Sequence, residues 1–570
     1  MPPTPPANAP LIVQSDFSIL ADIHAPDYEA VRPLLARFAE LERSPEHIHF
    51  YRISPLSLWN AAAAGMTLEE IVDVLGRYSR FTLPSNVVTD LAEYLGRYGK
   101  LVLLQEEATL LLYAEDGALL DRVAADERIA PMLGRRRSPD CCEVLPGWRG
   151  DLKQALVELG YPPHDRAGYV DGAPLEMELL PATRLGHAFQ LRAYQEEAVD
   201  AFYAQGSADG GSGVIVLPCG AGKTIVGLGV MRAAGTHTLI LCPNTVAVRQ
   251  WIAEILDKTT LRPDEVGEYS AERKEIRPVT VATYQIMTYR PFAVDESTGE
   301  VGDFPHMRLL RQSNWGLLIY DEVHLLPAPV FRATAELQAR RRLGLTATLI
   351  REDGRERDVF SLIGPKRYDL PWRDLEQSGF IAQAECIEVR VEMDDDRRME
   401  AALAESRQDA YRIAAENPAK LDVLLELARQ HRRDHVLVIG QYLDQLKAVA
   451  QRLGAPLLTG KTPTDERERL YAAFKRGEVP LLIVSKIANF AIDLPDADVA
   501  IQISGTFGSR QEEAQRLGRI LRPKRDGRPA RFYTIVTRDS RDQEFAAKRQ
   551  LFLAEQGYRY SIVPATTYLE

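Results

Sequence analysis

Short, continuously apolar runs alternate with amphipathic stretches through the last two-thirds of the chain. One series, between residues 185 and 365, reads "GVIVLP", "THTLILCP", "PVTVAT", "WGLLIYDE" and "RRLGLTAT"; a second, between 366 and 560, reads "HVLVIGQY", "APLLTG", "VPLLIVS", "VAIQIS" and "RFYTIV". Apolar strands separated by helices are typical of parallel sheets that are covered on both faces. The pattern predicts an α/β protein with two parallel-sheet domains in tandem.

The remaining segments have other patterns. Residues 11–137 mix amphipathic stretches such as "TLEEIVDVLGRYSR" with apolar runs such as "TLLLYA", which predicts an α+β N-terminal accessory domain. Residues 138–184 are rich in Pro, Gly and charge around one expected helix, so we interpret them as a connecting region. Residues 1–10 are proline-rich and predict a disordered tail. Around 394–418 a charged stretch predicts one long helix or two.

Composition narrows the class of protein. At 570 residues the chain predicts three or four domains. The net charge of −12 argues against a general nucleic-acid coat but permits a local basic track. The five cysteines form no CxxC pair, so a plain reduced pair at Cys141 and Cys142 is favoured over a redox switch. No apolar run approaches the roughly 20 residues of a membrane span, so we expect a cytoplasmic protein with no membrane partner.

The stretch "GVIVLPCGAGKT" has the strand–loop–helix context of a phosphate-binding loop, although Leu217 stands where the general pattern has glycine. Gly220 and Gly222 would let backbone amides converge on phosphate oxygens. Lys223 would supply a cation and Thr224 a magnesium ligand. An ordinary glycine-rich turn is the alternative, and the preceding strand and the Lys-Thr pair argue against it.

The stretch "LLIYDEVH" ends a buried strand with Asp321 and Glu322, at the edge where open parallel sheets bind ligands. Asp321 would hold magnesium, and Glu322 would position or deprotonate the attacking water. A helix-capping aspartate is the alternative. The nearby "GLTATL", residues 344–349, places small hydroxyl side chains at another strand end, where a functional role and a simple turn are equally compatible with the sequence.

Residues 508–541 carry ten Lys or Arg against four Asp or Glu, opposite in sign to the whole chain. Within "RLGRILRP", Arg516, Arg519 and Arg522 recur at three-residue steps, which places them along one side of a helix. Arg519 and Arg522 are candidate arginine fingers for the γ-phosphate, supplied by the neighbouring domain. A solvated basic face is the alternative.

Together, these motifs and the stretches "LRAYQEEAV", "LILCPN", "VATYQ" and "IVSKIANFAIDLP" occur in the order found in superfamily 2 helicases, which residues 185–540 resemble. Within that superfamily, "LPCGAGKT", "TATLIREDGRERDVF" and "GSRQEEAQRLGRILRPK" resemble the XPB type, in which a leucine occupies the position of Leu217. The resemblance implies two RecA-like motor domains and a helical thumb-like insertion near 394–418, with a bland helical linker as the alternative. It also implies a damage-recognition-like region near 138–184.

The resemblance also implies roles for single residues. Arg192 and Gln195 match the motif that recognises adenine, so ATP with Mg²⁺ is the expected cofactor pair. A DNA-opening triplet is matched by Arg351, Glu352 and Asp353, although a surface salt-bridge turn would have the same sequence.

Asp493 matches a family position near the ribose or the domain interface. Asn489 and Phe490 depart from the pattern that relatives tend to show beside it, which puts the contacts of that stretch in doubt.

The function implied by the resemblance is an ATP-dependent 3′–5′ DNA helicase that opens single-stranded or forked duplex DNA in nucleotide excision repair or in transcription-linked processes. A duplex DNA translocase and an ATP-driven switch subunit of a repair complex are the alternatives, because motor motifs do not determine the output. A third alternative is that the substrate is RNA, because the motifs do not distinguish RNA from DNA. A separate nuclease or another repair protein is the expected protein partner.

Overall fold

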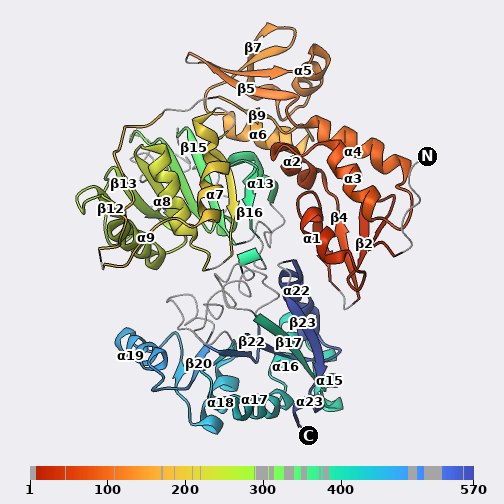
Figure 1. Ribbon diagram of the computed structural model, residues 1–570, viewed down its shortest axis with the longest axis vertical. Helices are drawn as coiled ribbons and strands as arrows, with labels where there is room; N and C mark the ends of the chain where they lie inside the picture. The colour runs from red at the N-terminus through yellow and green to blue at the C-terminus, as the bar shows by residue number, and fades with distance from the viewer. Residues whose placement is uncertain are drawn as a thin grey trace, which may run out of the picture. The chain divides into compact units, whose positions relative to one another are not determined.

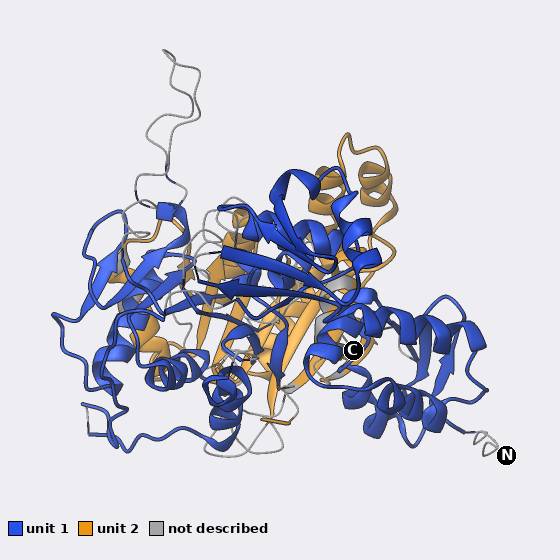
Figure 2. Ribbon diagram, turned by 90° about the horizontal axis from the view of Figure 1, so that it is seen from above, with its two compact units in different colours: residues 1–217, 222–369 blue, residues 218–221, 370–570 orange. Residues whose placement is uncertain are grey.

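The computed structural model of the chain divides into two compact units, residues 1–217 with 222–369 and residues 218–221 with 370–570 (Figure 2). The structure describes residues 8–44, 47–107, 109–167, 171–184, 186–207, 210–218, 220–287, 289, 306, 313–326, 339–347, 356–370, 374–375, 384–485, 497–505, 529–555 and 558–569.

A seven-stranded parallel sheet forms the largest layer of the first unit, with the strand order β12-β13-β11-β14-β15-β10-β16 (Figure 1). Its strands are β10 (Ser212–Val216), β11 (Thr238–Cys242), β12 (Val266–Tyr269), β13 (Val279–Thr283), β14 (Leu317–Asp321), β15 (Arg341–Thr346) and β16 (Lys366–Asp369). All residues of β11 and β13 are buried, as their continuously apolar sequences predict. The first expected parallel-sheet domain is confirmed.

Among the helices that the structure describes in this domain, α7 precedes the first strand and each of the others comes after a strand. They are α7 (Ala193–Tyr203), α8 (Lys223–Ala234), α9 (Thr245–Lys258), α10 (Tyr284–Met287) and α13 (Glu356–Leu362). Helices α7, α8 and α9 lie side by side along the sheet (Figure 1). Strand β16 belongs to this sheet although the sequence places the domain boundary at 365, so the first unit extends to Asp369.

Two small sheets precede the large one in the first unit. Sheet β1-β2-β4-β3 is antiparallel, whereas sheet β7-β8-β6-β5-β9 is mixed. The elements of the first are β1 (Leu11–Val13), β2 (Ser18–Asp22), α1 (Tyr28–Leu35), β3 (Glu40–Arg43), β4 (Ile48–Arg52), α2 (Pro55–Ala63), α3 (Leu68–Tyr78) and α4 (Ser85–Arg97). Those of the second are β5 (Leu101–Glu106), β6 (Thr109–Ala114), α5 (Gly117–Ala124), β7 (Leu133–Ser138), β8 (Cys141–Val144), α6 (Arg149–Glu158) and β9 (His164–Asp165).

This arrangement corrects the expected boundary after residue 137. Strand β8 pairs with β6 and strand β9 pairs with β5, so much of the supposed connecting region completes a folded sheet. Strands of two to four residues are too short to show a period in the sequence. Ala9 and Pro10, which were expected in the tail, are buried, and the Ala9 carbonyl accepts a hydrogen bond from Arg80 Nε at 2.6 Å.

Three helices of the first unit meet in an apolar junction. Trp59 of α2, Val157 of α6 and Phe360 of α13 are buried against one another. Beside them, Lys366 N–H at the start of the edge strand β16 donates to Asn60 Oδ1 at 2.9 Å. The accessory helices therefore cover the outer strand of the large sheet, which protects its unpaired backbone groups.

The second unit contains another seven-stranded parallel sheet, with the order β19-β20-β18-β21-β22-β17-β23 (Figure 1). Its strands are β17 (Ala384–Val391), β18 (Val436–Gly440), β19 (Leu457–Leu458), β20 (Leu481–Ser485), β21 (Val499–Gln502), β22 (Ala530–Thr537) and β23 (Arg559–Pro564). Its helices are α15 (Asp395–Ala402), α16 (Arg407–Ala415), α17 (Ala419–Gln430), α18 (Leu443–Leu453), α19 (Thr464–Lys475), α22 (Arg541–Glu555) and α23 (Thr566–Leu569). The second parallel-sheet domain is confirmed.

The charged stretch around 394–418 forms two helices, α15 and α16. Asp394 and Ser406 cap their first turns, accepting backbone N–H groups at 2.8 and 3.1 Å. Behind α16, the Lys420 ammonium of α17 contacts the Asp542 carboxylate of α22 at 2.6 Å, and neither side chain is more than 1% exposed. This ion pair joins two helices inside the second unit.

In the part of the chain that the structure describes, no helix is both long and apolar enough to cross a bilayer. Cys141 and Cys142 are buried free thiols, and burial raises the pKa of both. A raised pKa lowers the thiolate fraction that redox chemistry requires.

Candidate ATPase site

The phosphate loop lies between strand β10 and helix α8, whose first residue is Lys223. Gly220 and Gly222 have φ values of 82° and 80°, in the left-handed region that favours glycine. Leu217 is fully buried, and its N–H donates to the carbonyl of Thr346 at 2.9 Å. The leucine therefore extends the pairing of β10 with β15 by one residue, and the glycine of the general pattern is not needed there.

Gln195 lies against this loop. Its side-chain Oε1 accepts the backbone N–H of Arg192 at 2.9 Å, which caps the start of α7. A Cβ on Gly222 would come within 2.6 Å of the end of the Gln195 side chain, at Nε2, so the two residues are close neighbours; the positive φ is what requires glycine. The structure thus brings together the proposed adenine-recognition residue and the phosphate loop. The Arg192 side chain contacts Tyr194 OH at 3.3 Å.

Lys223 and Glu322 face each other across the site, with 3.2 Å between Nζ and Oε1. Both are largely buried, at 11% and 17% side-chain exposure. Glu322 follows strand β14 with φ 49° and ψ 55°, a left-handed conformation that costs a non-glycine residue about 1 kcal/mol or more. Such strain at a strand end is typical of functional sites.

Asp321 ends strand β14 and is held at two atoms. Trp251 Nε1–H of α9 donates to its Oδ2 at 3.0 Å, and Tyr284 OH donates to its backbone carbonyl at 2.5 Å. Burial, and then the neighbouring Glu322 carboxylate, raise the pKa of Asp321 to about 6, against the opposing effects of the Trp251 hydrogen bond and the Lys223 charge. No motif pointed to Trp251, which is 70 residues away from Asp321 along the chain.

His324 and Thr346 form a contact that the motifs alone did not predict. His324 Nδ1 lies 2.5 Å from Thr346 Oγ1 and 3.5 Å from Glu322 Oε2. Thr346 belongs to "GLTATL", for which the sequence left a functional role and a turn equally open. Its hydroxyl links the end of β15 to the turn that carries Glu322.

Comparisons with known proteins agree with this geometry. The family model "ERCC3/RAD25/XPB C-terminal helicase" matches residues 375–570, "Type III restriction enzyme, res subunit" matches 188–351, and "Helicase conserved C-terminal domain" matches 11–138. The "DNA 3'-5' helicase XPB" of Kineococcus radiotolerans is 55% identical over 98% of this chain and 97% of its own length. The chain belongs to the XPB family of DNA 3′–5′ helicases.

Other XPB relatives span similar shares of the chain. The "DNA 3'-5' helicase XPB" of Mycobacterium tuberculosis is 54% identical over 99% of both chains. The "General transcription and DNA repair factor IIH helicase/translocase subunit XPB" of Antonospora locustae is 34% identical over 98% of this chain and 82% of its own. Membership of the XPB family, together with the two parallel seven-stranded sheets, confirms the expectation of two RecA-like helicase domains.

Several predicted site residues lie outside the described residues. They are Arg351, Glu352 and Asp353 of the DNA-opening triplet, Asp493, and the arginines Arg516, Arg519 and Arg522. Their roles remain predictions.

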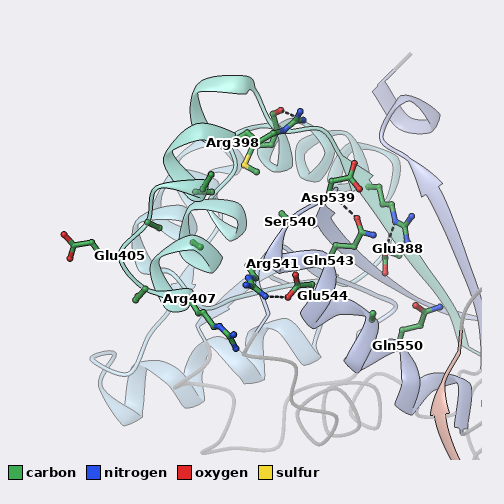
Figure 3. A pocket seen from close by; sticks show the side chains of 18 residues that line it. Glu388, Arg398, Glu405, Arg407, Asp539, Ser540, Arg541, Gln543, Glu544 and Gln550 are labelled. Carbon is green, nitrogen blue, oxygen red and sulfur yellow. Dashed lines mark hydrogen bonds and ion pairs between the residues drawn. The ribbon is translucent and has the colours of Figure 1, made fainter.

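A groove in the second unit has a volume of about 760 Å³ and is lined by helices α15, α16 and α22 and by strand β17. Figure 3 shows the side chains that line it. The charged residues around it are Arg390, Arg398, Arg407, Arg541, Glu388, Glu405, Asp539 and Glu544. Four basic and four acidic side chains balance, so the groove lacks the net positive charge expected where a phosphate backbone binds. A DNA contact by these thumb-like helices would therefore use a surface outside this groove.

Proposed function

We propose that this XPB-family helicase hydrolyses ATP at the site around Lys223 and Glu322, and uses the energy to move 3′ to 5′ on DNA and open the duplex. The observation that carries the proposal is the pairing of the Lys223 ammonium with the Glu322 carboxylate at 3.2 Å, beside a loop with two left-handed glycines. A phosphate-binding cation and a candidate base therefore occupy one small region of the first unit.

The residues fit ATP. Gly222 has the left-handed backbone that favours glycine, and it stands directly before Lys223, at the start of α8, where backbone amides would meet phosphate oxygens. Lys223 would contact the β- and γ-phosphates, and Gln195 would hydrogen-bond adenine with Arg192 beside it.

The residues also fit Mg²⁺. The Thr224 hydroxyl and the Asp321 carboxylate are hard oxygen donors of the kind that Mg²⁺ prefers. When bound, the ion would neutralise charge on the phosphate oxygens.

Lys223 would change partners during the reaction. In this structure it contacts Glu322, and on nucleotide binding it would turn to the phosphates. Glu322 would then lose its ion pair with Lys223 and would accept the proton of the attacking water. The His324–Thr346 contact would hold the turn that carries Glu322 in its left-handed conformation during this exchange.

The remaining roles are part of the same proposal. Arg519 and Arg522 would stabilise charge on the γ-phosphate as arginine fingers. Arg351, Glu352 and Asp353 would act in strand opening, Asp493 would act near the ribose, and the helices within 394–418 would serve as a thumb. We expect phosphate-directed, salt-sensitive binding of single-stranded or forked duplex DNA inside the cell.

Translocation on intact duplex is the second candidate. The Antonospora locustae relative carries "helicase/translocase subunit" in its name, which supports both this output and a partner protein for this chain. A separate nuclease or another repair protein is the partner that we propose.

The test uses two partial duplexes that differ only in carrying a 3′ or a 5′ single-stranded tail, with strand separation followed by fluorescence. We expect ATP-dependent opening of the 3′-tailed duplex alone, and none with Glu322→Gln. Rapid ATP turnover on DNA with neither duplex opened would instead favour the translocase.

A further inference from the structure

A buried tryptophan reaches the magnesium-ligand candidate from a neighbouring helix. Trp251 of α9 is 1% exposed, and its only polar atom, Nε1, donates to Asp321 Oδ2 at 3.0 Å. An indole N–H is a donor only, so the hydrogen bond occupies one carboxylate oxygen without neutralising the charge of the group.

Helix α8 has a glycine where the Trp251 ring packs against it. A Cβ at Gly227 would lie 2.5 Å from Cη2 and 3.1 Å from Cζ3 of Trp251, closer than side-chain carbons approach one another. Gly227 stands four residues after Lys223, on the same face of α8. One helix face thus presents Lys223 to Glu322 and leaves space for Trp251 to reach Asp321.

We propose that Trp251 positions Asp321 for binding Mg²⁺, and that Gly227, which has no side chain, leaves the room that the indole ring needs. This proposal rests on the proposed ATPase function. The indole hydrogen bond to Oδ2 restrains rotation of the Asp321 carboxylate, and the Tyr284 hydrogen bond to the backbone carbonyl holds the strand end that carries it. Its other oxygen, Oδ1, is then presented to the ion in a fixed direction. Partners behind a metal ligand typically change metal affinity by about 10- to 100-fold.

The test variant is Trp251→Phe in the full chain, which keeps an aromatic ring and removes the N–H. Trp59→Phe is the matched control, because Trp59 is also 1% exposed and its Nε1 donates to the Tyr94 carbonyl at 3.1 Å, in the accessory part of the unit. Mn²⁺ serves as the probe, with its affinity measured by electron paramagnetic resonance in the presence of a non-hydrolysable ATP analogue. Binding of the analogue without metal and the midpoint of thermal unfolding, Tm, are measured in parallel.

We expect Trp251→Phe to weaken Mn²⁺ binding by about 10- to 100-fold. Metal-free nucleotide binding should stay at the wild-type level, and Tm should fall no more than in Trp59→Phe, whose Mn²⁺ affinity should be unchanged. In an Asp321→Asn background, Trp251→Phe should cause no further loss of metal affinity, because the two residues act through one carboxylate.

Unchanged Mn²⁺ affinity in Trp251→Phe, or an equal loss of metal-free nucleotide binding, would overturn the proposal. Gly227→Ala is a second route to the same prediction, since its methyl group would displace the ring. If both variants fail to fold, the contact between Trp251 and Asp321 serves to stabilise the fold, and the proposal is wrong. If the wild-type chain binds no nucleotide, the proposed function itself fails.

Discussion

The Lys223 ammonium lies 3.2 Å from the Glu322 carboxylate, so before nucleotide arrives the phosphate-binding cation and the proposed base neutralise each other. This pairing keeps two largely buried charges compensated, which a buried site requires. It also means that ATP must displace Glu322 from Lys223 in order to bind.

Glu322→Gln should therefore bind ATP at least as tightly as the wild type and hydrolyse it very slowly, because the amide competes less strongly for Lys223 and accepts no proton. Equilibrium binding of a fluorescent ATP analogue and single-turnover hydrolysis measure the two effects separately. Wild-type turnover in this variant would exclude Glu322 as the base.

Asp321→Asn should raise Tm at neutral pH when Mg²⁺ is absent. The pKa of Asp321 is raised from 3.8 to about 6, so between those values the folded chain binds more protons than the unfolded chain, and the contribution of this group to stability falls as pH rises. The advantage of the variant should shrink as pH falls below about 6 and vanish near pH 4, which thermal melts at several pH values would show. A constant difference across that range would contradict the assignment.

The same shift predicts that Mg²⁺ binding weakens at acid pH, because a metal ligand must be ionised. Below about pH 6 the apparent Mg²⁺ affinity of wild-type chain with nucleotide should fall with protonation of Asp321. Titrations of Mg²⁺ at fixed nucleotide concentration between about pH 5 and 8, a window above the ordinary pKa of an aspartate, measure this. Affinity independent of pH in that window would count against a raised pKa.

Lys420→Ala should destabilise the second unit strongly. It would leave the Asp542 carboxylate, 1% exposed, without the ammonium 2.6 Å away, and breaking a buried pair costs about 3–5 kcal/mol. Chemical denaturation followed by circular dichroism measures the loss. The double variant Lys420→Met with Asp542→Leu should recover much of it, whereas an exposed pair such as Lys447–Asp444 should tolerate Lys447→Ala.

Arg522→Ala should reduce DNA-stimulated ATP turnover by about 10³-fold if Arg522 acts as an arginine finger. Arg525→Ala, a basic residue of the same segment, is the control for a general loss of positive charge. Equal losses of turnover in both variants would indicate that the positive charge of the segment attracts DNA. Unchanged turnover in Arg522→Ala would exclude Arg522 as an arginine finger.

The sequence predicted the parts of the site that are encoded locally. The strand, the glycine-rich loop and the helix that begins with Lys223 are consecutive in the chain, so one short motif predicts the position of Lys223. Asp321 likewise follows directly from the apolar strand that it ends. Gly222 was predicted to bring amides toward phosphate, and the structure adds that Gln195 fills the space beside it.

The contacts between distant segments were not predictable in this way. Trp251 looks like a core residue of an amphipathic helix, and only the packing of α9 against α8 and the neighbouring strand β11 brings its N–H to Asp321. His324 and Thr346 likewise meet because β14 and β15 are neighbours in the sheet. Strands β8 and β9 were not predicted, because their sequences are too short to show a period. They form strands because they pair with β6 and β5.

Steady-state ATP hydrolysis by the full chain, alone and with single-stranded DNA, duplex DNA or RNA, tests the central claim most directly. Lys223→Ala is the blank, because it removes the phosphate cation. We predict strong stimulation by DNA, weak or no stimulation by RNA, and no turnover in the blank. Turnover that no nucleic acid stimulates, or that Lys223→Ala retains, would contradict a DNA motor driven from this site.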